Sequence, residues 1–284
     1  MIELDAATVL LQWAVGGLFF LWITGRRRQV GIGYGWTIRL SFMVIAAISL
    51  AVGLAFNTVV VREVATVGLL LATTVAMVVS IQRRKAGVAG QRDVIERRSQ
   101  RVAGMTGIDR DEQRFDRSIP EFPPNLDLIA PIIGAIGLLA GAIAAEGPTA
   151  LSIARVAVGT LFLGAVTDAM LLGHWYLVQP GLPREPIHEL VRWTGFLWLP
   201  ELVVLLWPIG MVSVLNGTID DGYNGLLGWF WVACVITTIA LVFVTMAALR
   251  EKQYSAVMAA TGLLYLAILT AFGMDLVARV LLDT

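Results

Sequence analysis

The sequence predicts an all-α, polytopic integral membrane protein with eight transmembrane helices, and three observations support this fold class. The composition is 57% hydrophobic and only 15% charged, with a mean hydropathy of +0.78. Such a composition lies well outside that of soluble globular domains. Long apolar runs recur along the whole chain, and most Lys and Arg residues fall in alternate connecting segments. Lipid is therefore the expected solvent for most of the chain.

A helix needs about 20 mostly apolar residues to cross a hydrocarbon layer of about 30 Å. The runs that meet this length are continuous rather than alternating, which favours helices over a β-barrel. The first run follows an acidic N-terminus without the basic segment of a secretory signal, so we expect it to be a retained helix. The predicted spans are residues 8–25, 38–56, 64–82, 127–146, 151–178, 194–215, 226–249 and 255–282.

The distribution of positive charge predicts the orientation. With both termini outside, the outer side keeps only Arg62, Arg155 and Arg279, and the other 18 of the 21 Lys and Arg residues fall at inner loops and helix ends. This asymmetry follows the positive-inside rule and predicts a multi-pass protein of the bacterial inner (plasma) membrane.

The chain divides into three segments of one membrane domain: residues 1–82 with three spans, a connector at 83–126, and residues 127–284 with five spans. The connector is basic and cytoplasmic in this orientation. Apolar residues spaced among its arginines suit a helix lying on the inner leaflet, and a solvated linker is the alternative. Acidic residues dilute the arginines, so we expect no nucleic-acid partner.

Two spans share a local likeness, AVGGLFFLWIT at 14–24 and AVGTLFLGAVT at 157–167. Their offset is close to half the chain, which indicates two parallel four-helix halves. A chance match between apolar segments is the alternative. The first half contains no histidine and no obvious buried acid, so the two halves have diverged if the duplication is real.

The fifth and sixth spans carry the most unusual side chains. Asp168 and Glu201 are acids within apolar runs, where a charge costs about 2.5–3.5 kcal/mol on insertion scales. His174 lies nearer the inner surface. Because the two spans form a hairpin, we expect these three residues to share one wetted cavity and relay protons. The alternative is that Asp168 hydrogen-bonds a neighbouring helix and Glu201 pairs with an arginine.

The turn between these spans combines aromatic rings with hydrogen-bond donors, as a quinone site requires. The alternative is an ordinary belt of aromatic residues and snorkelling arginines at the membrane interface, which contains the same mixture. The predicted quinone-binding residues are His174, Trp175, Tyr176, Arg184, His188 and Arg192.

A haem b held by His174 and His188 is a weaker alternative, because prolines interrupt the helix between them and no other histidine is present. The single cysteine and two histidines predict no metal site. The sequence also contains no phosphate loop, nucleophile elbow or HExxH motif.

The leading hypothesis from the sequence is a membrane subunit of a bacterial respiratory or electron-transfer complex. It has a quinone-binding, proton-relaying pocket at the inner end of the fifth and sixth spans and works with other subunits. Whether the chain itself is catalytic is left open. A proton-coupled secondary transporter is the first alternative, and a structural or assembly subunit is the second.

Overall fold

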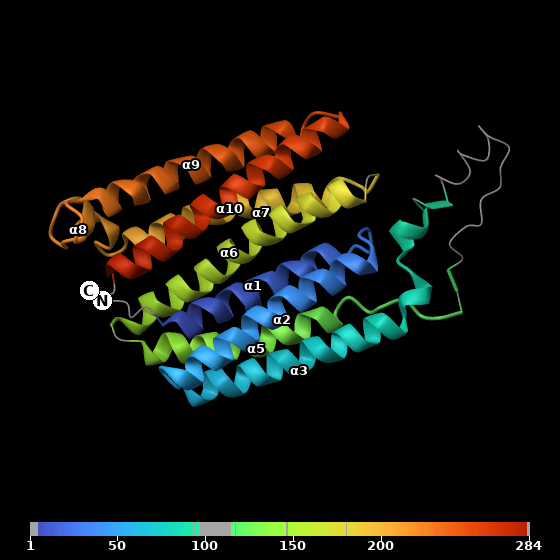
Figure 1. The fold of residues 1–284 in the computed structure, drawn as a ribbon, viewed down its shortest axis with the longest axis horizontal. Helices are drawn as coiled ribbons and strands as arrows, with labels where there is room; N and C mark the ends of the chain where they lie inside the picture. The colour runs from blue at the N-terminus through green and yellow to red at the C-terminus, as the bar shows by residue number, and fades with distance from the viewer. Residues whose placement is uncertain are drawn as a thin grey trace.

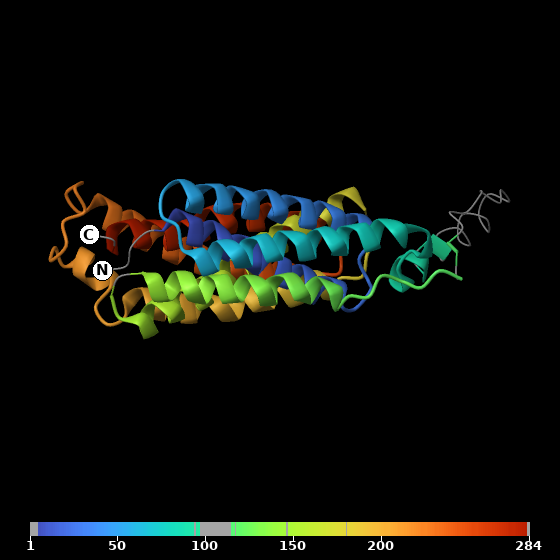
Figure 2. The same cartoon turned by 90° about the horizontal axis from the view of Figure 1, so that it is seen from below.

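The computed structural model describes residues 5–93, 95–96, 115–116, 118–145, 147–179 and 181–282, and these ranges contain helices but no β-strand. The long helices run side by side along the longest axis of the molecule (Figures 1 and 2). They are α1 (Ala6–Gly25), α2 (Ile32–Ala55), α3 (Val60–Gln82), α5 (Leu126–Ala144), α6 (Thr149–Val178), α7 (Glu185–Leu206), α9 (Leu226–Ala248) and α10 (Tyr254–Leu282). The short helices are η1 (Arg84–Ala86) and α8 (Met211–Leu215).

Seven helices of the described ranges are long and apolar enough to cross a membrane: α1, α2, α3, α5, α6, α9 and α10. Their outward surfaces carry large apolar side chains such as Leu40, Leu71 and Ile132, each more than half exposed. Such continuous apolar surface is expected where lipid is the solvent. The protein is therefore a multi-pass membrane protein. Helix α7 has a similar length but is less apolar, because it carries Glu185, Glu189, Arg192 and Glu201.

The long helices form two four-helix groups with the same pattern of neighbours. In the first group, α1 packs on α2, α2 on α3, α3 on α5 and α5 back on α1. In the second, α6 packs on α7, α7 on α9, α9 on α10 and α10 back on α6. Helices α1 and α6 also pack on each other at the centre (Figure 1). This layout agrees with the predicted pair of four-helix halves, whereas a duplication of the sequence stays a prediction.

Glycines allow the two central helices to approach closely. A Cβ on Gly16 would lie 2.0 Å from the carbonyl oxygen of Thr160, and one on Gly164 would lie 2.3 Å from the carbonyl carbon of Gly16. Either side chain would force the backbones of α1 and α6 apart. Small residues serve the same purpose at helix contacts in membranes generally.

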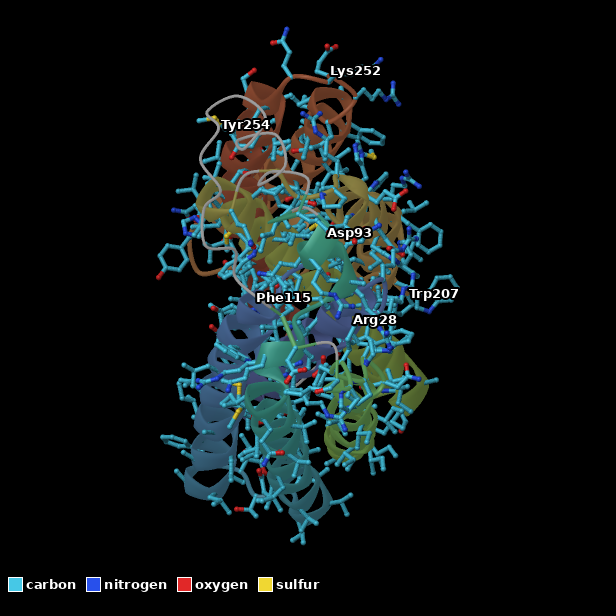
Figure 3. The ribbon with its side chains drawn as sticks, turned by 90° about the vertical axis from the view of Figure 1, so that its right-hand side faces the viewer. Arg28, Asp93, Phe115, Trp207, Lys252 and Tyr254 are labelled. Atoms are coloured by element: carbon cyan, nitrogen blue, oxygen red, sulfur yellow. The ribbon has the colours of Figure 1, made fainter. Side chains whose placement is uncertain are left out.

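One end of the bundle holds the connections α1–α2, α3–α5, α6–α7 and α9–α10 (Figure 1), and we call it the basic end. Figure 3 looks onto this end, where Arg28 and Lys252 are labelled. The opposite end, which we call the distal end, holds both termini and the connections α2–α3, α5–α6 and α7–α9. The basic end gathers Arg26, Arg27, Arg28, Arg83, Arg84, Lys85, Arg92, Arg184, Arg250 and Lys252.

The predicted helix on the inner leaflet is described only in part. Residues 89–93 and 95–96 are helical, and the rest of that segment, from 97 to 114, lies outside the described residues. The backbone N–H of Gly90 donates to the carbonyl of Arg28 at 3.0 Å, which ties this short helix to the α1–α2 connection.

The predicted sixth span, residues 194–215, is wrong in its position. Helix α7 begins at Glu185, next to Pro186 in its first turn, and ends at Leu206. Pro208 has no N–H to continue the helix, and a Cβ on Gly210, at φ +40°, would lie 2.0 Å from the carbonyl oxygen of Leu205. The chain therefore turns there before α8. Hydropathy alone does not predict this start, because the first turns of α7 are polar.

Candidate functional site: buried carboxyl groups between the helices

Four helices contribute five buried polar side chains to one group in the distal half of the bundle. We call it the distal polar cluster, and it consists of Gln12 of α1, Arg155 of α6, Glu201 of α7, and Asp275 and Arg279 of α10. Nε of Arg279 donates to both carboxylate oxygens of Asp275 at 2.9 Å, as expected for residues one turn apart. Gly159 makes space for this group, because a Cβ there would meet Gln12 Nε2 at 2.7 Å and Arg279 Nη2 at 2.8 Å.

Glu201 is the least satisfied member of the cluster. Its side chain is fully buried, and neither carboxyl oxygen makes a hydrogen bond of standard geometry in the described part of the chain, although the carboxyl of Asp275 is close enough to share a hydrogen bond with a protonated Glu201. Asp275, Arg279 and Arg155 are its electrostatic neighbours. Buried polar groups without a partner are rare in folded proteins, and each one calls for an explanation such as a bound water, an ion or a catalytic role.

Asp168 is a second fully buried acid, and it too has no hydrogen-bond partner among the described residues. Its electrostatic neighbour is Tyr34 of α2, whose buried hydroxyl lies near Thr24 without making a hydrogen bond of standard geometry among the described residues. Next to it, Trp13 Nε1 donates to Thr167 Oγ1 at 3.0 Å, which joins α1 to α6. Tyr34 also lines a small cavity of about 50 Å³ near the basic end, together with Arg39 and Asp127.

The structure does not bring Asp168, Glu201 and His174 into one cavity, so the expected convergence is wrong. Because α7 begins at Glu185, Glu201 lies 16 residues along it, about 24 Å from the basic end. Asp168 lies ten residues before the end of α6, about 15 Å from the same end. The two acids therefore lie at different depths and have different neighbours.

His174 is an exposed residue of α6, on another face from Asp168. Its Nδ1 lies 3.0 Å from the hydroxyl of Tyr265 on α10, and the two rings meet edge to face. His188 lies in different surroundings near the start of α7, where it lines an open cleft beside the α1–α2 connection. A haem shared by the two imidazoles stays a prediction from the sequence.

The cleft at the basic end, of about 540 Å³, brings together part of the predicted quinone-binding set. His188 and Arg192 line it beside the rings of Trp193 and Phe196. Its remaining walls are charged: Arg27 lies 3.1 Å from Glu189 and 3.6 Å from Glu185.

The other predicted quinone-binding residues make structural contacts away from this cleft. Arg184 donates to the carbonyls of Lys252 and Gln253 at 2.7 and 2.8 Å, which fastens the α9–α10 connection. Tyr176 is buried, and its hydroxyl donates to the carbonyl of Pro183. Trp175 Nε1 donates to Gln179 Oε1 at 3.1 Å.

Sequence reasoning missed two buried ionic groups in the first half. Arg39 of α2 forms a bidentate pair with Asp127 of α5, with both N···O distances at 2.7 Å. At the distal end, Arg62 pairs with its neighbour Glu63 at 2.6 Å and with Asp5. The expectation that this half has no buried acid is therefore wrong. These residues lie at the edges of apolar runs, where ionisable side chains are typical of loops and helix ends, so the sequence pattern does not predict that they pair in the interior.

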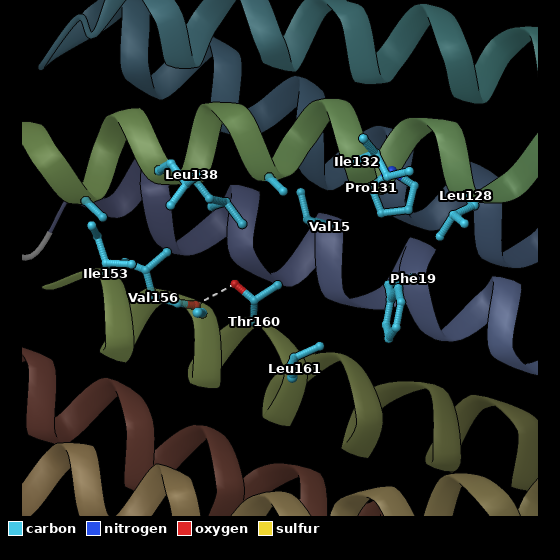
Figure 4. Close-up of a pocket in the computed structure, with 14 residues that line it drawn as sticks. Val15, Phe19, Leu128, Pro131, Ile132, Leu138, Ile153, Val156, Thr160 and Leu161 are labelled. Atoms are coloured by element: carbon cyan, nitrogen blue, oxygen red, sulfur yellow. Dashed lines mark hydrogen bonds between the residues drawn. The ribbon is translucent and has the colours of Figure 1, made fainter. Parts of the chain in front are cut away.

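An apolar groove of about 370 Å³ lies between α1, α5 and α6 (Figure 4). Val15, Phe19, Leu138 and Ile153 are among its lining residues, and the hydroxyl of Thr160 is turned back onto the carbonyl of Val156 at 2.6 Å. The groove therefore presents hydrocarbon and no free polar group.

The fold and these sites define a class: a multi-pass membrane protein that buries ionisable side chains between its helices. In the described residues, no group of three or more His, Cys, Asp or Glu side chains is placed to hold a metal ion. Comparison with known protein families, with curated proteins and with solved structures gives no match for this chain. Its function is therefore inferred from its own geometry.

Proposed function

We propose that this protein carries protons across the membrane as a proton-coupled secondary transporter. Helix α7 serves as an eighth crossing, and the basic end lies in the cytoplasm of a bacterial inner membrane. The observation that carries the proposal is the pair of fully buried carboxyl groups: Asp168, which has no hydrogen-bond partner among the described residues, and Glu201, whose polar neighbours include a second carboxyl group, that of Asp275. Ionisable groups inside membrane helices are costly, and their usual role is in ion or proton pathways.

The positions of these groups suit a relay that approaches both ends of the bundle. Glu201 lies five residues from the end of α7, about 8 Å of helical rise from the distal end. Asp168 lies closer to the basic end, and its neighbour Tyr34 lines the small cavity there. A neutral carboxyl is far cheaper to bury than a carboxylate, so each site can hold a proton that it releases when water or a cation approaches.

The test uses proteoliposomes that contain a pH-sensitive dye, with proton flux driven by an imposed pH gradient. We expect flux in the wild type and its loss in Glu201→Gln and Asp168→Asn. Glu251→Gln, at an exposed position of the α9–α10 connection, is the matched control and should keep full flux.

Infrared difference spectra of the same proteins at two pH values should show the C=O stretch of a protonated carboxyl that each of the two variants partly removes. Flux and spectra unchanged in both variants would overturn the proposal. That result would favour a structural or assembly subunit.

A second candidate function, a quinone-binding subunit of an electron-transfer complex, is favoured by the cleft at the basic end. His188 and Arg192 supply hydrogen-bond donors for quinone carbonyls, and Trp193 and Phe196 supply apolar surface for the ring. A short-chain benzoquinone should quench tryptophan fluorescence, and His188→Ala and Arg192→Ala should weaken that binding.

The control for the quinone site is His174→Ala, because His174 pairs with Tyr265 and does not line the cleft. Equal quenching in all three variants would exclude a quinone site in this cleft.

A further inference from the structure

The distal end holds a cleft of about 510 Å³ that reaches the buried polar cluster. It lies between the start of α6 and the α7–α9 connection, and Ser152, Ser213 and Thr218 contribute hydroxyl-bearing side chains to its lining. Arg155 belongs both to this lining and to the distal polar cluster, since Glu201 and Arg279 are its electrostatic neighbours. Arg155 thus connects the cleft with the polar cluster that contains Glu201.

Arg155 makes two hydrogen bonds to backbone carbonyls and has one nitrogen, Nη1, without a partner among the described residues. Its Nε donates to the carbonyl of Val204 at 2.8 Å and its Nη2 to that of Trp207 at 2.9 Å, which caps the end of α7. Its Nη1 has no hydrogen bond to the described part of the chain and is not among the fully buried polar atoms without a partner. Nη1 is therefore accessible from the cleft.

The charge balance of the cluster depends on one proton. Glu201 and Asp275 carry two negative charges when both are ionised, and Arg155 and Arg279 carry two positive charges, so the cluster is then neutral. When Glu201 takes up a proton, the cluster keeps one uncompensated positive charge, and Arg155 is the cationic member that lines the cleft. A buried charge interacts strongly because the effective dielectric constant is low. The exposed carboxyl of Asp220 on the rim opposes an anion, but water screens it far more.

We infer that the distal cleft binds a small carboxylate anion through Arg155, and that this binding is coupled to protonation of Glu201. The inference rests on the proposed proton-carrying function and names the class of its co-substrate. Proton and carboxylate then enter together, and the occupied site carries the same net charge as the empty, deprotonated one.

The test is calorimetric titration of the purified protein with acetate in two buffers that differ in protonation enthalpy. We expect uptake of one proton per acetate, and an affinity that rises by up to about tenfold for each unit by which the pH falls. Glu201→Gln mimics the protonated acid, so it should bind acetate without proton uptake and without this pH dependence. Arg155→Gln should lower the affinity at least tenfold.

Two further variants keep the result interpretable. Ser213→Phe fills the cleft without removing the cap that Arg155 provides for α7, and it should also abolish acetate binding. Arg250→Gln, at an exposed position of the basic end, should leave binding unchanged. If acetate fails to bind, or binds equally well in Arg155→Gln and Ser213→Phe, the inference is overturned.

A third arm separates a free carboxylate from a lipid headgroup. Binding of short-chain phosphatidylglycerol in place of acetate, lost in Ser213→Phe, would assign the cleft to lipid and overturn the inference. Proton flux that depends on Glu201 without any acetate binding would leave the proposed function standing. Acetate binding in a protein without flux would remove the proposed function instead.

Discussion

Removing one partner of the buried pair between Arg39 and Asp127 should strongly destabilise the protein. The two side chains are only 3% and 6% exposed, and the guanidinium also donates to Ser80 at 3.3 Å and stacks over the ring of Phe122. Asp127→Asn leaves the charge of Arg39 buried without its counter-ion. Breaking a buried pair in this way costs about 3–5 kcal/mol. The Coulomb energy of two opposite unit charges about 4 Å apart, about 4 kcal/mol at an effective dielectric constant of about 20, agrees with this cost.

The assay is reversible unfolding in mixed micelles, followed by far-ultraviolet circular dichroism, with Asp127→Asn, Arg39→Met and the double variant. We expect each single variant to lose about 3–5 kcal/mol of unfolding free energy and the double variant to lose much less than their sum. Thr37→Ala, at an exposed position of the same helix, is the control. Single losses below about 1 kcal/mol, or simple additivity, would refute the reasoning.

Three further predictions concern other contacts in the structure. Gly16→Ala should cost about 1–3 kcal/mol by separating α1 from α6, whereas Gly262→Ala, with no atom within 4 Å of its Cβ, should be neutral or stabilising in the same unfolding assay.

Burial raises the pKa of the Asp221 carboxyl, but hydrogen bonds from the backbone N–H groups of Gly225, Tyr223, Gly228 and Leu227 outweigh it, so the pKa lies below its ordinary value. Its contribution to stability should be complete above the unfolded pKa of about 3.9 and lost as the pH falls through the folded value. The test measures the free energy of unfolding of the wild type and of Asp221→Asn as a function of pH. A difference between the two proteins that does not change with pH would contradict the prediction. Tyr265→Phe should cost no more than about 1.5 kcal/mol, because it removes one hydrogen bond to the exposed His174, and a larger loss would mean that the pair is structurally central.

The membrane fold could be predicted from the sequence because each apolar run responds mainly to lipid, its immediate solvent. The length and hydropathy of α1, α3 and α9, for example, are local properties that need no knowledge of neighbours. The position of α7 could not be predicted in this way, since its first turns are polar and its end depends on the turn at Pro208 and Gly210.

The candidate site was predicted residue by residue only in part. Asp168 and Glu201 were recognised because a charge inside an apolar run is costly wherever the helix packs. Their electrostatic neighbours Tyr34, Asp275 and Arg155 were not predicted, because these residues come close to the acids only through helix packing, which no local sequence pattern specifies. The turn between α6 and α7 was expected to form one pocket, yet its side chains divide between a cleft, a loop anchor and an exposed His–Tyr pair.

The amino-acid sequence by itself determined which segments enter lipid and which ends of the helices gather Lys and Arg, since hydropathy and charge act on each segment separately. Only the tertiary structure decided which buried acid faces which arginine. Which neighbour a helical side chain meets depends on where the helix starts, how it is rotated and how deep it lies. Because α7 starts nine residues before the predicted span, Glu201 lies in the distal half of the bundle and not in the half next to the basic end.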